Sequence, residues 1–509
     1  GPDRAANNPP QAIDRTIQYG IVDYNLENLY DYRNNPFSGC DFVGDSGCTN
    51  AGTPFLAPVS PPYDYVPASD AVYQARLTDI ATQIVNDLHT PDILMVQEVE
   101  NQDICIVIRA ALTCGTTDNA DGKPDVLQEL ALKVASMGGP AYDAAFDRDS
   151  SDLRGIAPAY LYRTDRVQLL AATGDPVLGA SPAIGTYTAV PYNSDVSNPK
   201  TLNAVYTGTG ACETSWVFPR APDVALFGIW SSSIGVGTRT DVYAIDNHFK
   251  SGPDTCVAHR TEQAKYNAAL VAFIEAAKPD ARIVVGGDLN VYPRPDDPFA
   301  PIGQPGSSDQ LGSLYDPALG LTNLWDVLLG QAPDAAYSYV YLGQAQTLDQ
   351  VFVNAPMRAS LDQFRIAHIN SDFPADYAGD VARGTSDHDP NVAAFTLQFP
   401  FSGFFSPVKA APALNAAKAG QTIPVKFSLD GSRGLDIFAQ APVVTPVACS
   451  DLAPSGATVA ATGKLRYDAG ADQYIYTWQT DKAWAGTCQR LAFTLSDGTF
   501  HEALFHFAK

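Results

Sequence analysis

The chain has 509 residues, of which 45% are hydrophobic and 17% charged, a composition that excludes disorder, collagen and coiled coil as its main architecture. One hydrophobic core usually stops growing at roughly 250 to 300 residues, so at least two domains are expected. Its 56 acidic and 32 basic residues give a net charge of −24, which argues against tight passive binding of nucleic acid unless cations or a local basic groove intervene. No run approaches the ~20 apolar residues of a membrane span, so stable membrane insertion is not expected.

After a flexible N-terminus expected at residues 1–14, apolar β-branched runs alternate with amphipathic stretches as far as residue 400. This alternation predicts an α/β domain in which helices cover the faces of sheets. Residues 71–86 and 262–277 carry apolar side chains at helical spacing, and we expect them to be helices. The expected buried strands are residues 16–24, 92–97, 159–162, 224–230, 241–247 and 282–286.

Helical periodicity disappears after Phe401, and short apolar strands alternate with turn residues to the end of the chain. This pattern predicts a small β-sandwich over residues 403–509. The segment 407–429, which includes Gly420-Gln-Thr-Ile-Pro-Val-Lys-Phe427, resembles an Ig-like module appended to secreted bacterial proteins. We find no catalytic constellation there and expect an accessory domain, either passive or binding a surface. The expected strands are residues 422–429, 458–467, 473–478 and 491–495.

Eight cysteines fall into four near-neighbour pairs along the chain, and none has the Cys-x-x-Cys spacing of a metal or redox site. We predict four disulfides, which indicate an oxidising compartment and a secreted or periplasmic bacterial protein whose signal peptide has been removed. The alternative is a set of buried thiols in a cytosolic enzyme. The predicted pairs are Cys40 with Cys48, Cys105 with Cys114, Cys212 with Cys256, and Cys449 with Cys488.

Six fragments place polar side chains at the ends of apolar strands. Taken singly each has an ordinary explanation, since Glu98 could cap a turn, His248 could be a satisfied buried histidine, and Asp387 with Asp389 could form a solvated turn. Together, carboxylate and amide oxygens with two histidines and no cysteine suit Mg²⁺, Mn²⁺ or Ca²⁺ better than structural zinc. The fragments are residues 24–28, 97–100, 246–251, 286–290, 348–353 and 386–390.

In order and spacing these fragments resemble the endonuclease/exonuclease/phosphatase (DNase I-like) superfamily over residues 15–398. The resemblance implies a four-layer α/β sandwich, two packed sheets flanked by helices, as the catalytic domain over residues 15–400. Within that superfamily the chain is most similar to secreted bacterial nucleases. The residues that carry the narrower similarity are Asn25-Leu-Glu-Asn-Leu-Tyr30, Asn247-His-Phe-Lys-Ser-Gly252, Cys256, Arg260 and Gln263.

The resemblance also implies a role for each site residue. Glu98 matches the main metal carboxylate, Asn25 lies beside it, and Asp387 matches a ligand of a second metal. Mg²⁺ in proteins is usually bound by one or two carboxylates and keeps several water ligands. The few ligands expected here, Glu98, Asn25 and Asp387, agree with that preference.

The expected catalytic residues match the same superfamily pattern. Asp288 corresponds to the base that orients the attacking water, and Asn290 contacts the phosphate or positions that carboxylate. His248 and His388 correspond to the pair that grips phosphoryl oxygens and supports the leaving group. Asp349 corresponds to the partner that fixes the tautomer and charge of His388, since a histidine paired with a carboxylate can stay cationic near neutral pH.

Three further features are weaker predictions. Arg154 could hold a substrate phosphate or form a structural salt bridge, and Lys250 could attract anions or simply extend to solvent. Asp118, Asp121 and Asp125 resemble part of a calcium loop, although the full set of ligands is missing. We therefore expect Mg²⁺ at the catalytic site and consider a structural Ca²⁺ at this loop.

The predicted function is a secreted, metal-dependent phosphoester hydrolase, with a nuclease or phosphodiesterase favoured. The net charge of −24 stands against the nuclease unless bound divalent ions or a local rim of Arg and Lys offset it. An acidic surface is no handicap to the alternative, a phosphatase or phosphodiesterase acting on small organic or lipid phosphates. A third alternative is a non-catalytic binding protein, against which the presence of every expected polar residue argues. The expected partner is accordingly a phosphoester substrate, either nucleic acid or an organic phosphate.

Overall fold

The computed structural model divides the chain into two compact units, Gly1–Ala355 with Asp362–Ala394, and Pro356–Leu361 with Phe395–Lys509. We describe each unit by itself. Among the described residues no helix is long and apolar enough to cross a membrane. The described residues are 8–33, 66–116, 119–152, 154–208, 212, 215–252, 255–293, 309–374 and 382–508.

The first unit contains a six-stranded sheet with the strand order β16-β17-β1-β2-β6-β5. Strand β1 pairs in parallel with β2, and the register places Asn25 opposite Gln97. The pairing is irregular beyond that point on both sides of β2, which is where Glu98 lies. The strands are β1 (Gln18–Leu29), β2 (Ile93–Glu100), β5 (Tyr142–Ala145), β6 (Ile156–Arg163), β16 (Leu361–Ile366) and β17 (Asn391–Thr396).

A second sheet has the order β12-β15-β11-β10-β9-β7, with β8 paired to β9. Its register puts His248 of β10 opposite Asp288 of β11, and Asp288 opposite Asp349 of β15. Residues directly opposite one another point to the same face, so three candidate side chains lie side by side. The strands are β7 (Val167–Leu169), β8 (Lys200–Thr201), β9 (Asp223–Trp230), β10 (Arg239–His248), β11 (Arg282–Asp288), β12 (Thr322–Asn323) and β15 (Asp349–Val353).

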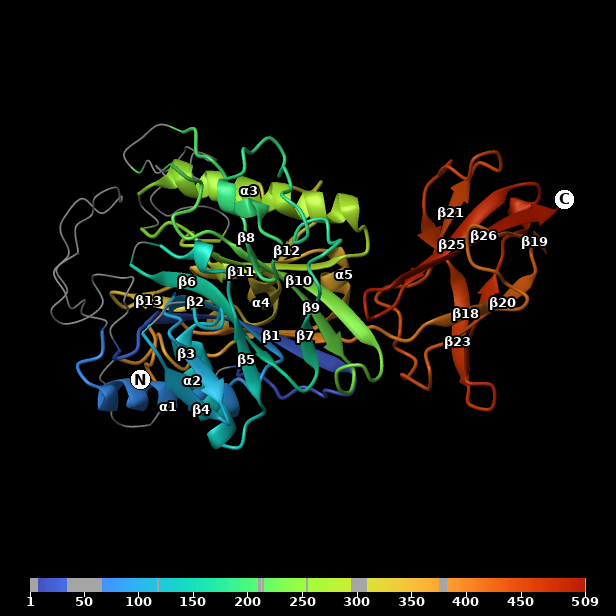
Figure 1. Cartoon of the computed structure of the whole chain (residues 1–509). Helices are drawn as coiled ribbons and strands as arrows, with labels where there is room; N and C mark the ends of the chain where they lie inside the picture. The colour runs from blue at the N-terminus through green and yellow to red at the C-terminus, as the bar shows by residue number, and fades with distance from the viewer. Residues whose placement is uncertain are drawn as a thin grey trace. The chain divides into compact units, whose positions relative to one another are not determined.

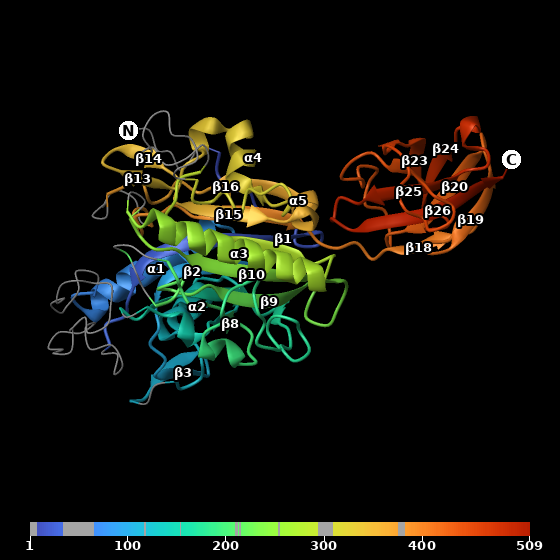
Figure 2. The same cartoon turned by 90° about the horizontal axis from the view of Figure 1, so that it is seen from above.

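The two sheets face each other, because β1 and β2 contact β10 and β11. Helices α1 (Asp70–Asn86) and α2 (Asp125–Ser136) pack on the outer face of the first sheet, and α3 (Val257–Ala277) packs on the outer face of the second (Figures 1 and 2). Helix α1 begins where Ser69 accepts a hydrogen bond from the Val72 N–H, and it buries one apolar stripe against the sheet. The predicted α/β character is therefore confirmed.

Shorter elements join these layers. Asp125, which the sequence placed in a calcium loop, is the first residue of α2. The remaining elements of the first unit are β3 (Cys105–Ile108), β4 (Ala111–Cys114), α4 (Leu324–Gln331), β13 (Tyr339–Tyr341) and β14 (Gln344–Gln346). Helix α5 (Ala355–Ser360) belongs to the second unit from Pro356 on.

The second unit is built from two sheets, with the orders β18-β20-β24-β23 and β19-β26-β25-β21-β22. Val425, Trp478 and Phe505 come from both sheets and share one buried cluster, so the sheets pack face to face. The strands are β18 (Ser402–Phe405), β19 (Leu414–Lys418), β20 (Thr422–Ser428), β21 (Val443–Val447), β22 (Val459–Ala460), β23 (Thr462–Asp468), β24 (Gln473–Gln479), β25 (Cys488–Thr494) and β26 (Phe500–Ala508).

Three of the four predicted disulfides are present. Cys105 is bonded to Cys114 across the β3–β4 hairpin, Cys212 to Cys256, and Cys449 to Cys488. The predicted pair Cys40 with Cys48 lies outside the described residues. The bonded cysteines are compatible with an oxidising compartment and remove the alternative of free thiols at these six positions.

Candidate active site

Asp288, the last residue of β11, lies at the centre of a buried polar cluster. Its Oδ2 is 3.2 Å from Nδ2 of Asn25, 3.5 Å from Nε2 of His248 and 4.0 Å from Nε2 of His388. Its Oδ1 accepts a 2.9 Å hydrogen bond from the backbone N–H of Asn290. Asn290 itself has a left-handed backbone conformation, with a φ of 50°. Burial raises the pKa of Asp288 to about 7, and His388 opposes this effect. The carboxyl group is thus poised to exchange a proton near neutral pH.

His388 is held by a carboxylate and an aromatic ring. Its Nδ1 lies 2.7 Å from Oδ2 of Asp349, and that oxygen also accepts a 2.6 Å hydrogen bond from the Ser338 hydroxyl. The Tyr339 ring centre lies 4.8 Å from the imidazole. Burial alone would lower the pKa of His388, but Asp349 and the nearby Asp387 raise it well above its ordinary value. The ring is therefore cationic at neutral pH and directs Nε2 toward Asp288.

His248 has the opposite electrostatic character. Its Nε2 lies 3.6 Å from Oε1 of Glu98 and 3.5 Å from Asp288, and its Nδ1 has no hydrogen-bond partner among the described residues. Burial, followed by the charges of Arg220 and Arg154, lowers the pKa of His248 well below its ordinary value. The cluster thus contains one neutral and one charged imidazole on either side of a carboxylate.

Glu98 adopts an unusual backbone conformation, with a φ of +61°. Left-handed φ is uncommon outside glycine and here coincides with the irregular pairing of β2. Its Oε2 accepts a 2.8 Å hydrogen bond from the Asn28 N–H, and the side chain is 15% exposed. The irregularity turns this carboxylate toward His248 and leaves it accessible.

Two groups of residues could hold a metal ion. Asn25 and Glu98 offer oxygen donors from neighbouring strands, but Nδ2 of Asn25 donates to Asp288 and its Oδ1 already accepts the Glu27 N–H at 2.9 Å. A second group, Asp288 with Asp349 and His388, presents ligand atoms within 4.8 Å of one another. The first set offers hard oxygen donors, and the second offers carboxylate oxygens with one imidazole; both fit a divalent ion such as Mg²⁺.

The remaining predicted ligand and phosphate contacts surround this cluster. Asp387 is 46% exposed with Oδ1 3.7 Å from Nε2 of His388, and Asn290 donates from Nδ2 to the Phe249 carbonyl at 3.4 Å. Arg154 does form the salt bridge that the sequence left open, at 3.3 Å from Asp152, and also donates to Oδ1 of Asn28 at 3.3 Å. Lys250, which is half-buried, follows β10 two residues after His248.

At the predicted calcium loop, Asp118 lies outside the described residues. Both oxygens of Asp125 accept backbone hydrogen bonds, from Ile104 at 3.1 Å and Cys105 at 3.0 Å. Asp121 accepts a 2.7 Å hydrogen bond from the Gln128 amide. The carboxylates of Asp121 and Asp125 thus serve local structure, and calcium binding there stays a prediction.

Sequence reasoning missed two arginines next to the cluster. Arg76 of α1 donates from Nη2 to the carbonyls of Leu26 and Glu27, each at 2.7 Å, and to the Thr385 carbonyl at 3.3 Å. Arg220 is only 4% exposed and precedes β9. Neither arginine belongs to a short motif that would have predicted its place next to the cluster. For Arg220, the sequence offers one indication: it lies in the segment Pro219-Arg220-Ala221-Pro222, just before an apolar strand.

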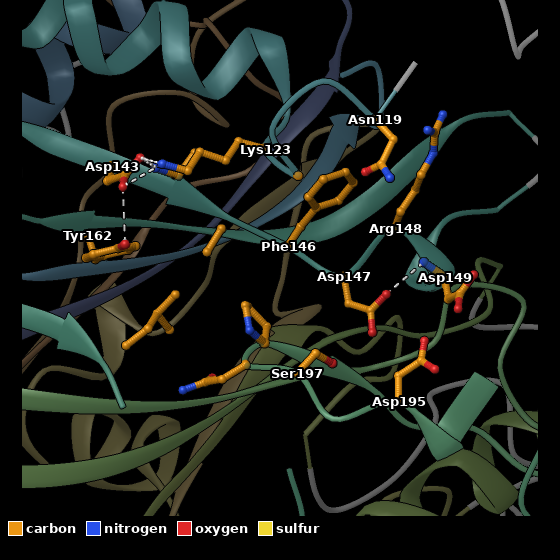
Figure 3. A pocket seen from close by; sticks show the side chains of 16 residues that line it. Asn119, Lys123, Asp143, Phe146, Asp147, Arg148, Asp149, Tyr162, Asp195 and Ser197 are labelled. Carbon is orange, nitrogen blue, oxygen red and sulfur yellow. Dashed lines mark hydrogen bonds and ion pairs between the residues drawn. The ribbon is translucent and has the colours of Figure 1, made fainter. Parts of the chain in front are cut away.

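A cavity of about 720 Å³ lies elsewhere in the first unit, and none of the catalytic or metal candidates lines it (Figure 3). Lys123 and Asp143 form an ion pair in its wall at 2.6 Å, and the Tyr162 hydroxyl donates to the same carboxylate at 3.3 Å. This cavity is therefore separate from the polar cluster.

Comparison with known proteins gives no matching family model and no matching curated protein. Solved structures similar to the chain include three that are each 13% identical to it. A truncated Caenorhabditis elegans TDP2 aligns over 74% of this chain and 97% of that chain with a TM-score of 0.36, and a selenomethionine TDP2 from the same organism over 74% of both chains, also with 0.36. An endonuclease/exonuclease/phosphatase family protein from Bacteroides thetaiotaomicron aligns over 75% of this chain and 98% of that chain with a TM-score of 0.37.

Proposed function

We propose that the first unit is a divalent-metal-dependent phosphoester hydrolase that cleaves a P–O bond by attack of water. One observation carries this proposal: the buried Asp288 carboxylate lies between a neutral histidine at 3.5 Å and a cationic histidine at 4.0 Å. A phosphodiester is a poor electrophile because its anionic oxygens repel nucleophiles. Its hydrolysis needs a positioned base, donors on the phosphoryl oxygens and positive charge near the departing oxygen.

The chain's own residues supply each of these functions. Asp288 in its ionised form accepts a proton from the attacking water, and Asn25 and the Asn290 N–H hold the carboxylate in place. His388 donates from Nε2 to a phosphoryl or departing oxygen, while Asp349 keeps its Nδ1 protonated. His248, neutral and buried, donates from Nε2 to a second phosphoryl oxygen.

A bound divalent cation would act as a Lewis acid on a non-bridging phosphoryl oxygen. We propose that Glu98 and Asn25 hold it, with Asp387 available to a second ion. What supports this choice is the accessible carboxylate of Glu98 and its strained backbone, which directs it into the cluster. In the alternative ligand group, His388 and Asp349 are already engaged with each other, at 2.7 Å.

The favoured substrate is nucleic acid, which makes the protein a nuclease or phosphodiesterase. The alternative is a phosphatase or phosphodiesterase for small organic or lipid phosphates, which the net charge of −24 does not disfavour. Turnover of plasmid DNA, RNA, bis(p-nitrophenyl) phosphate and p-nitrophenyl phosphate with Mg²⁺, Mn²⁺ or Ca²⁺ tests the proposal. Hydrolysis of the monoester alone would rule out the proposal that the protein is a nuclease. Nicking of plasmid DNA that persists in a chelator would rule out the metal-dependent mechanism.

We further propose that the first unit is a four-layer α/β sandwich and that residues 403–509 form an Ig-like accessory domain, with the boundary near residue 400. The two facing sheets with outer helices support the four-layer sandwich. The two packed sheets of the second unit support the Ig-like domain. Three disulfides support secretion to the periplasm or the medium. Limited proteolysis that leaves two stable fragments would test the boundary.

A further inference from the structure

A second group of buried polar side chains lies between the two sheets, next to the catalytic cluster. Asp23 is two residues before Asn25 on β1, and Asp246 is two residues before His248 on β10. Because alternate residues of a strand point to the same face, each carboxyl shares a face with its catalytic neighbour. Gln97 of β2, which is also fully buried, reaches between the two carboxyls. We call Asp23, Gln97 and Asp246 the inter-sheet layer.

The apolar neighbours on these strands show which way the layer points. Val22 of β1 and Val96 of β2 belong to the apolar cluster that α1 and α2 cover, and Ile245 of β10 belongs to the cluster that α3 covers. These three residues therefore face outward from the pair of sheets. The inter-sheet layer alternates with them along each strand, so its side chains face the opposite sheet.

Gln97 connects the two sheets by hydrogen bonds. Its Nε2 donates to Oδ1 of Asp23 at 2.9 Å and to Oδ1 of Asp246 at 2.6 Å. A side-chain amide nitrogen carries two hydrogens, so each carboxyl takes one of them. Burial, followed by the neighbouring Asp23, raises the pKa of Asp246 well above its ordinary value. Asp246 is therefore neutral at neutral pH, and its contact with Gln97 is a hydrogen bond between neutral groups.

Gln97 also lies where the regular pairing of β2 ends. It pairs with Asn25, and the next residue, Glu98, has the left-handed φ of +61°. Continued alternation would point Glu98 outward with Val96, but the irregular backbone instead brings its Oε1 to 3.6 Å from Nε2 of His248. This distance joins a strand of one sheet to a strand of the other. The separation of the sheets at Gln97 thus decides how far Glu98 lies from His248.

We propose that Gln97 is a positioning residue, which fixes the distance between Glu98 and His248 by bonding Asp23 and Asp246 across the two sheets. This inference rests on the proposed hydrolase function, in which Glu98 holds the cation and His248 donates to a phosphoryl oxygen. Apolar contacts also hold the sheets together, but they are not directional and do not select one separation. Hydrogen bonds have a narrow range of length and angle, so the inter-sheet layer does.

Three substitutions separate the hydrogen bonds from simple packing. Gln97→Met keeps the length of the side chain and removes both donated hydrogens, Asp246→Leu removes one acceptor, and Asp246→Asn keeps a neutral acceptor. The readouts are Mn²⁺ affinity, measured by electron paramagnetic resonance without substrate, and kcat for bis(p-nitrophenyl) phosphate. Gln97→Met and Asp246→Leu should each lower both by roughly 10- to 100-fold, the usual cost of losing a residue that orients a metal ligand. Asp246→Asn should retain most of both.

Gln128→Met is the matched control, because it removes a buried glutamine of α2 whose amide donates to Asp121 at 2.7 Å. This variant should lower Tm at most and leave Mn²⁺ affinity and kcat unchanged. If Gln97→Met does not fold, the comparison of Asp246→Leu with Asp246→Asn decides in its place.

Crystal structures of the metal-free wild type and Gln97→Met measure the distance from Glu98 to His248 directly, so they test the inference even if the wild type hydrolyses no phosphoester. We expect this distance to grow by roughly 1 Å in the variant, a displacement large enough to impair catalysis. A folded Gln97→Met protein with an unchanged distance and unchanged Mn²⁺ affinity would overturn the inference. So would an Asp246→Asn protein that loses as much Mn²⁺ affinity as Asp246→Leu.

Discussion

Nδ1 of His388 lies 2.7 Å from Oδ2 of Asp349, two residues that are 39 positions apart in the chain. Asp349 begins β15, which pairs with β11 so that Asp349 stands opposite Asp288. The pairing of β11 with β15 therefore places two carboxylates beside His388: Asp349, which raises its pKa, and Asp288, which lies near its Nε2. A positively charged imidazole can persist in a buried site only because its partner is equally buried and hydrogen-bonded.

Removing the imidazole of His388 should reduce hydrolysis without unfolding the chain. We expect His388→Ala to lower kcat for bis(p-nitrophenyl) phosphate by roughly 10²- to 10⁴-fold, the usual contribution of one positioned acid. The chain should stay folded, because the ring occupies the end of a polar cluster and not the apolar core, but Tm should fall because the buried Asp349 carboxylate loses its cationic partner. Comparable kcat values for wild type and variant would show that His388 only supports structure.

The pH dependence follows from the opposite requirements of two groups. Asp288 must be ionised to accept a proton, so the rate should rise as pH passes through about 7. His388 must stay protonated, and its pKa is raised well above the ordinary value, so the rate should fall only at clearly alkaline pH. Asp349→Asn removes the charge that raises this pKa and should move the alkaline limb to lower pH. A pH profile with an unchanged alkaline limb in Asp349→Asn would contradict the pairing.

Glu98→Gln distinguishes the two candidate metal groups. If Glu98 holds the ion, this substitution should raise the Mg²⁺ concentration needed for half-maximal activity by at least about tenfold, since a neutral amide is a weaker ligand for a hard cation. Glu262→Gln is the matched control, because its carboxylate pairs with Lys265 at 3.3 Å and is not part of the polar cluster. A metal requirement that shifts in Asp349→Asn but not in Glu98→Gln would assign the ion to the alternative group.

Arg76 should act as a positioning residue. It ties the end of β1 to the segment before His388 by donating to the carbonyls of Leu26, Glu27 and Thr385. We expect Arg76→Ala to lower the free energy of unfolding of the unit by roughly 1 to 3 kcal/mol. The variant should also need a higher Mg²⁺ concentration for half-maximal activity, since Asn25 and Glu98 would lose their fixed spacing. Arg76→Lys should recover only part of both losses. Thermal unfolding and metal titration of the two variants provide the check, and a drop in Tm with an unchanged metal requirement would limit Arg76 to stability.

The sequence was sufficient for features that depend on local spacing. Periodicity predicted the helix at 71–86, observed at 70–86, and the cysteine spacing predicted three observed disulfides. The strand expected to end at residue 24 continues to Leu29, because Asn25 and Leu29 still pair with Gln97 and Val99 of β2, and the polar residues between them did not signal a strand.

Contacts between distant segments could not be read in this way. Arg220 joins the cluster through Asp152 and Phe249, which lie 68 and 29 residues away. Arg76 contacts Thr385 across 309 residues. Neither contact leaves a short-range pattern, since each depends on how the sheets and helices pack. Family resemblance could predict which polar residues meet, but not which charges surround them.

The most direct test of the central claim is the rate of metal-dependent diester hydrolysis by Asp288→Asn. Asparagine keeps the size of the side chain and one acceptor but cannot take a proton from water. With saturating Mg²⁺ at pH 8 and an unchanged Tm, we predict a loss of roughly 10²-fold or more in kcat. A folded Asp288→Asn protein that hydrolyses bis(p-nitrophenyl) phosphate at close to the wild-type rate would contradict the account.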